Sequence, residues 1–95
     1  MSFFLTVFTF SVSTLNVISS GCVDGVQPHN MQEMVQMAKQ DGFACQQHPG
    51  VMSFTCPNND GRIMRMILVK DKKECETQPE RELQNLRVLM KKDYK

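Results

Sequence analysis

Four cysteines in a chain of 95 residues constrain what this sequence can fold into. A domain of this length buries a modest core, and small exported domains often gain the missing stability from disulfides. An even number of cysteines behind an export-like N-terminus therefore predicts two disulfides. The alternative is a cytosolic chain with reduced, buried thiols, since free cysteine packs as a small hydrophobic residue. The candidate disulfide residues are Cys22, Cys45, Cys56 and Cys75.

Four cysteines allow three disulfide pairings. One is Cys22–Cys45 with Cys56–Cys75, and another is Cys22–Cys56 with Cys45–Cys75. Each of these two would tie a segment next to a helix to the sheet. The third, Cys45–Cys56 with Cys22–Cys75, requires the two central cysteines to lie directly opposite each other in a hairpin. A four-residue loop places them on a diagonal instead, so we rank this pairing last.

The first 21 residues have the outline of a secretory signal peptide. They carry no charged side chain, their front is rich in Phe, Leu and Val, and they end in small residues. Cleavage at this end would leave residues 22–95 as a single small secreted domain. Too few consecutive residues are apolar for a transmembrane helix, which needs about 20.

Two other interpretations of this segment stay open. Phe8, Phe10 and Val12 alternate with Thr and Ser, which is the period of a β-strand that the mature protein would retain. The residues before Cys22 also resemble a lipoprotein cleavage box, in which that cysteine would be lipidated.

Residues 28–41 have the apolar period of an amphipathic helix. Asn30 and Glu33 have the spacing of a capping box, and Gly42 can adopt the positive φ that ends a helix. The apolar stripe consists of Met31, Met34, Val35 and Ala38.

A second helix is expected near the C-terminus. Thr77 and Glu80 repeat the capping-box spacing, so the helix should begin there, after a charged loop that contains Cys75. Acidic residues at its start and lysines at its end match the helix dipole. Its stripe consists of Leu83, Leu86 and Met90.

Three strands are expected between the helices. Residues 43–47 and 52–56 alternate with period two around His48-Pro49-Gly50, which predicts a hairpin. Pro57–Gly61 is the strongest turn signal, and residues 62–70 are apolar on both faces, so both faces need cover. The fold class is α+β: a small disulfide-stabilised domain with a three-stranded antiparallel meander flanked by two helices, in the order α-β-β-β-α.

Catalytic motifs are missing from the sequence. There is no Gly-rich phosphate loop, no GxSxG, no HExxH and no CxxC. His29 and His48 are the only imidazoles, and both flank turn or cap residues. With all cysteines paired, no thiolate nucleophile remains. We expect no enzyme, no catalytic residue, no metal site and no cofactor.

The spacing of the methionines suggests one exception to the expected absence of a metal site. Met31, Met34 and Met37 are spaced by three, and Met64 and Met66 by two. Thioether clusters outside the cytosol can bind Cu(I), because a soft ligand suits a soft ion. A methionine stripe at helical spacing is more often core packing. An extracellular metal-handling protein is therefore an alternative function.

The leading functional hypothesis is a small secreted, non-enzymatic protein. It would be a venom peptide or another extracellular effector, monomeric, that binds an unknown protein target. A net charge of +1 does not favour nucleic acid or an anionic membrane as partner. If residues 1–21 are retained, an intracellular structural or RNA-binding module is the alternative, since α-β-β-β-α is also the element order of double-stranded-RNA-binding domains.

Overall fold

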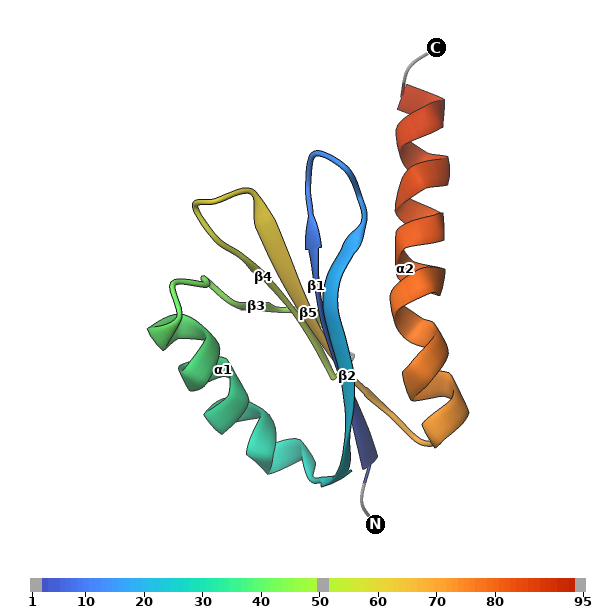
Figure 1. Ribbon diagram of the computed structural model, residues 1–95. Coiled ribbons are helices and arrows are strands. Elements are labelled where there is room, and N and C mark those ends of the chain that lie inside the picture. The colour runs from blue at the N-terminus through green and yellow to red at the C-terminus, as the bar shows by residue number, and fades with distance from the viewer. Residues whose placement is uncertain (1–2, 50–51, 94–95) are drawn as a thin grey trace.

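A computed structural model of the chain describes residues 3–49 and 52–93. All strand pairs in it are antiparallel, and they form one sheet in the order β2-β1-β5-β4-β3. Helices α1 and α2 lie on opposite faces of this sheet (Figure 1). The elements are β1 (Phe3–Ser11), β2 (Val17–Val26), the short 3-10 helix η1 (Pro28–Asn30), α1 (Met31–Gln40), β3 (Gln46–Gln47), β4 (Ser53–Pro57), β5 (Arg62–Val69) and α2 (Lys72–Asp93).

The predicted count of three strands is wrong, because the sheet has five. Residues 3–26 contribute the two strands that the prediction lacks, β1 and β2. The domain is nevertheless a small α+β unit with an antiparallel sheet, two main helices and two disulfides. Its element order, β-β-α-β-β-β-α with η1 before α1, is not that of a double-stranded-RNA-binding domain.

Strand β1 joins the two halves of the sheet. It pairs with β2 on one side and with β5 on the other. Leu5, Thr6 and Phe8 are fully buried, and Phe10 is nearly so. Successive side chains of a strand point to opposite faces, so β1 supplies apolar groups to both faces at once. In this fold residues 3–11 form a β-strand, as in the alternative interpretation of the N-terminal segment. The signal peptide stays a prediction, and sequencing the N-terminus of the natural protein would test it.

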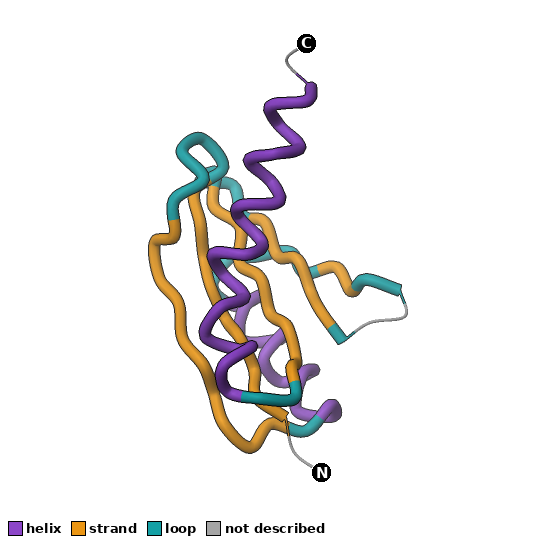
Figure 2. Tube along the Cα trace, turned by 90° about the vertical axis from the view of Figure 1, so that its right-hand side faces the viewer, coloured by secondary structure: helices purple, strands orange, loops and turns teal. Residues whose placement is uncertain are grey.

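Two hydrophobic cores lie on the two faces of the sheet, which confirms that β5 needs cover on both sides. On the α1 face, Met66 of β5 and Leu5 of β1 pack with the buried residues of the helix. Those helix residues are Met31, Val35 and Ala38, with Met34 half-buried beside them. On the other face, Phe8 and Phe10 pack against Leu83 of α2. Figure 2, viewed from the α2 side, shows α2 crossing in front of the sheet.

Helix α1 confirms the first predicted helix, although its start differs. Asn30 makes no side-chain cap bond to α1; its Oδ1 accepts a hydrogen bond from the Gln27 N–H at 3.0 Å and so closes η1. At the other end, Gly42 has a φ of 92°, as expected for a glycine that ends a helix. The predicted turn before β5 also forms, with Gly61 at a φ of 74°.

Helix α2 begins earlier than predicted. Asp71 is its cap, and its Oδ1 accepts a hydrogen bond from the Glu74 N–H at 2.7 Å. Thr77 is therefore inside the helix, where its hydroxyl donates to the Glu74 carbonyl at 3.2 Å. Cys75 and Pro79 are also inside the helix rather than in a loop.

Candidate functional site

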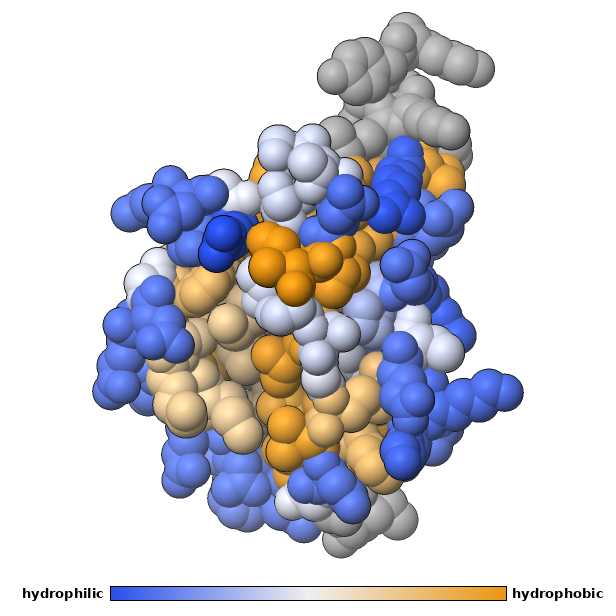
Figure 3. Space-filling view, viewed as in Figure 1, coloured by the Kyte–Doolittle hydropathy of each residue, from blue (hydrophilic) through white to orange (hydrophobic). Residues whose placement is uncertain are grey.

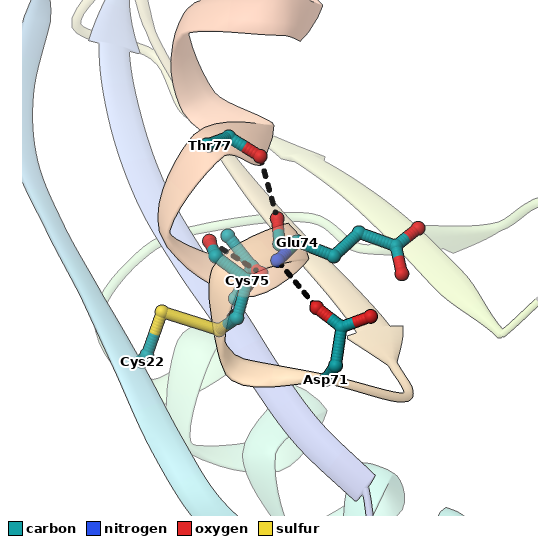
Figure 4. Close-up of a disulfide and its surroundings, with 6 residues drawn as sticks. Cys22, Asp71, Glu74, Cys75 and Thr77 are labelled. Atoms are coloured by element: carbon teal, nitrogen blue, oxygen red, sulfur yellow. Dashed lines mark hydrogen bonds between the residues drawn. A yellow bond between two sulfur atoms is a disulfide. The ribbon is translucent and has the colours of Figure 1, made fainter.

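Cys22 of β2 and Cys75 of α2 form a disulfide that ties the edge of the sheet to the start of the helix (Figure 4). Their Cα atoms are 6.1 Å apart, within the ordinary range for a disulfide. Cys75 is fully buried, whereas the residue Cys22 is exposed at the sheet edge. The bridge closes a sequence separation of 53 residues, so it holds together parts of the chain that are distant in sequence.

A threonine of β1 completes the surroundings of this disulfide. The Thr6 hydroxyl lies 3.1 Å from both the carbonyl oxygen and the Sγ of Cys75. In a regular helix the Cys75 carbonyl would accept from the N–H of residue 79, but Pro79 has none. Thr6 therefore satisfies the buried acceptor that Pro79 leaves without a donor.

The second disulfide joins Cys45 and Cys56, so the pairing that we ranked last is the one that forms. The ranking is wrong because the hairpin adopts the shifted register: Gln46 lies opposite Thr55, which places the two cysteines opposite each other. Their Cα atoms are 4.0 Å apart. The predicted first strand shortens to Gln46–Gln47, and the end of the predicted loop, residues 50–51, lies outside the described residues. All four cysteines are paired.

A groove of about 330 Å³ opens beside the first disulfide, between the edge strand β2 and the start of α2. One wall comes from β2 and the other from the first turns of the helix. Polar and apolar groups share the lining, and Glu76 places an exposed carboxylate on it. The lining residues are Ser20, Gly21, Cys22, Cys75, Glu76 and Pro79.

The outer edge of β2 is a long exposed strand. It is the terminal strand of the sheet, and every residue from Ile18 to Gly25 is exposed. Ile18 and Val23 expose 49% and 41% of their surface, and Asp24 is the one charged residue of the strand. Figure 3 looks onto this edge and shows hydrophobic surface down its middle, with hydrophilic surface on both sides. Lysine and proline, which commonly block further pairing at a sheet edge, are absent from β2. The register of β2 on β1 is irregular at Ile18 and at Asp24–Gly25, and regular from Ser19 to Val23.

A second cavity, of about 280 Å³, lies on the α2 face. Arg65 of β5 lines it and pairs with Glu82 of α2 at 2.9 Å. The same guanidinium donates to the Thr55 hydroxyl at 2.7 Å and to the Phe54 carbonyl at 3.2 Å. The Arg65 and Glu82 side chains that line this cavity are therefore paired with each other. Glu82 is one of the acidic residues expected at the start of the second helix, and it lies in the middle of α2 because that helix begins at Lys72.

The two histidines are not assembled into a catalytic site. His29 lies in η1 and is exposed. His48 is exposed as well, and its Nε2 lies 2.6 Å from the Thr55 hydroxyl. Among residues 3–49 and 52–93, no three His, Cys, Asp or Glu side chains gather as a metal site.

The two methionine motifs, distant in sequence, meet in space. Met34 and Met37 of α1 and Met64 and Met66 of β5 line one cavity of about 160 Å³ on the α1 face. Sequence spacing identified both motifs, but only the packing of α1 on β5 brings them to one place.

Comparisons with protein-family models, with curated proteins and with solved structures give no match. None of the helices in the described part of the chain is long and apolar enough to cross a membrane. A function for this protein must therefore be inferred from its own geometry.

Proposed function

We propose that this is an extracellular, non-enzymatic protein that binds an extended segment of a partner protein along the outer edge of β2. A venom peptide or another secreted effector would fit this description. The observation that carries the proposal is the exposed edge Ile18–Gly25, which adjoins the groove against α2.

The disulfides support an extracellular setting. One pair joins β2 to α2, the other joins the residue before β3 to β4, and no thiol is left free. Such bridges persist outside the cytosol and are rare where thiol-reducing systems operate. Paired cysteines are consistent with a secreted protein, and they also leave no thiolate for catalysis.

Strand addition is the binding mode that the edge favours. A partner strand beside β2 would use the outward-facing N–H and C=O groups of the edge for main-chain hydrogen bonds. Alternate side chains of that partner could enter the groove lined by Cys22, Cys75 and Pro79. Backbone pairing then supplies affinity and the groove supplies selectivity. Ile18 and Val23 add apolar area on the same strand.

Export through a cleaved leader at residues 1–21 is a separate prediction. Cleavage after Gly21 would remove all of β1 and the first five residues of β2, Val17–Gly21. The proposed binding edge is therefore complete only in a protein that retains residues 1–21. Sequencing the N-terminus of the natural protein distinguishes the two products.

The test uses peptides selected from a phage-displayed random library on the oxidised full-length chain. We expect a selected peptide to slow amide hydrogen exchange within Ile18–Gly25 of β2. The double variant Ile18→Lys/Val23→Lys should weaken that binding strongly, since edge lysines oppose strand pairing. Val12→Lys is the matched control, because Val12 is 47% exposed in the β1–β2 turn but off this edge.

Two outcomes would contradict the proposal. Protection located elsewhere, or none, would remove β2 as the site. Concentration-dependent dimerisation that the edge lysines abolish would assign the strand to a second copy of this chain instead of a partner protein.

A further inference from the structure

We propose that Met34, Met37 and Met64 form a binding site for a soft monovalent cation, Cu(I), in the cavity between α1 and β5. This site lies on the face of the sheet opposite α2, so it is independent of the proposed binding edge. No His, Cys, Asp or Glu cluster takes part, and the ligands are thioether sulfurs.

The convergence of the two motifs is the first argument. Met34 and Met37 are one helical turn apart on α1, which places them on neighbouring positions of the helix surface. Met64 and Met66 lie on the face of β5 that α1 covers, since Met66 belongs to the core on that face and Met64 packs against it. All four side chains line the same cavity of about 160 Å³. That volume admits an ion, since one water needs only about 10–15 Å³ measured in the same way.

Core packing accounts for only part of this cluster. Met66 is 2% exposed and fills the α1-face core as methionine commonly does. Met34 and Met64 are half-buried at the rim of that core, and Met37 is 61% exposed. The three outer methionine side chains therefore lie between the core and solvent, where an ion can reach them.

The remaining chemistry of the site fits a soft cation. All four thiols of the chain are in disulfides, so thioethers are the soft ligands that remain. Neutral thioethers leave the charge of the ion uncompensated. Asp41 lines the same cavity with an exposed carboxylate, which lowers the local positive charge when the ion is bound.

The first test titrates Ag(I), a closed-shell soft ion that needs no reductant, into the oxidised full-length protein. Reductants must be avoided because they attack the disulfides. We expect a one-to-one complex by native mass spectrometry. Methyl NMR signals of Met34, Met37 and Met64 should shift, while that of Met52, which is 37% exposed and outside the cavity, should not. Anaerobic titration with acetonitrile-stabilised Cu(I) should reproduce this pattern.

The second test replaces the sulfurs and keeps the volume. Met→Leu changes conserve side-chain size, so Met34→Leu/Met37→Leu/Met64→Leu should fold like the parent. We expect this triple variant to lose affinity for both ions by about tenfold or more, and Met52→Leu to lose none. A missing one-to-one complex, shifts centred on Met52, or a triple variant that binds like the parent would each overturn the proposal. The methyl shifts of the parent protein decide the matter even if the triple variant fails to fold.

Discussion

The hydroxyl of Thr6 donates a hydrogen bond to the carbonyl oxygen of Cys75 across 69 positions of sequence, at 3.1 Å. Pro79 makes that bond necessary, because its ring nitrogen cannot donate to the same carbonyl. A residue of β1 thus compensates for a proline inside α2, next to the disulfide that joins α2 to β2. Three elements depend on one another at this point.

Thr6→Val should destabilise the protein by about 1–3 kcal/mol, because it keeps the volume and leaves a buried carbonyl without a donor. In a Pro79→Ala background, the helical N–H of residue 79 returns, and the cost of Thr6→Val should fall. Chemical denaturation of the four proteins in this double-mutant cycle measures the coupling. An equal cost in both backgrounds would show that Thr6 does not serve the Pro79 acceptor.

A chain that starts at Cys22 should not form this fold. It lacks β1, whose Leu5, Thr6 and Phe8 are fully buried, and β5 loses one of its two neighbours in the sheet. We expect the oxidised 22–95 fragment to show no cooperative thermal melt, whereas the full-length chain should show one. A fragment that melts cooperatively and keeps both native disulfides would indicate that residues 1–21 are dispensable, as the signal-peptide prediction requires.

The two disulfides should contribute unequally to stability. In the chain-entropy model, the Cys22–Cys75 loop of 53 residues contributes about 4 kcal/mol, and the Cys45–Cys56 loop of 11 residues about 3 kcal/mol. Replacing each pair by alanine compares them fairly, since each contains one fully buried cysteine. Thermal melts should show the larger loss for Cys22→Ala/Cys75→Ala. The reverse order would mean that native-state contacts outweigh loop closure.

Methionine substitutions on α1 should separate core from surface. Met31 is 1% exposed, so Met31→Ala should cost about 2–5 kcal/mol. Met37→Ala should cost much less, because Met37 is 61% exposed. Denaturant midpoints of the two variants, without added metal, check the orientation of the helix. Similar losses would mean that α1 is rotated relative to this packing.

The Arg65–Glu82 ion pair should contribute more to stability than the Arg87–Glu80 pair of α2. The side chains of Arg65 and Glu82 are 15% and 31% exposed, and they lie 2.9 Å apart. Glu82→Gln should therefore cost about 1 kcal/mol. Glu80→Gln is the control, because Glu80 is 76% exposed and lies 3.9 Å from Arg87; its change should stay within about 0.5 kcal/mol. Equal losses of stability for the two variants in urea denaturation would mean that Glu82 gains nothing from its pairing with Arg65.

Local patterns predicted much of the middle of the fold. The apolar period of α1, the turn that ends at Gly61 and the two apolar faces of β5 all follow from neighbouring residues. A missed signal was also local: Asp71 and Glu74 have the same cap spacing as Thr77 and Glu80, and the earlier pair marks the real start of α2.

The helical and strand periods, the turn signals and the methionine motifs could be predicted from the amino-acid sequence, because each depends on residues that are close along the chain. How these parts combine depends on contacts between distant segments. The strand β2 is rich in Gly and Ser and has weak strand preference, so its pairing with β1 creates it. The hairpin register made Cys45 face Cys56, and the packing of α1 on β5 brought the methionines together. Such long-range pairings depend on the competition of all segments for one core, which no local pattern encodes.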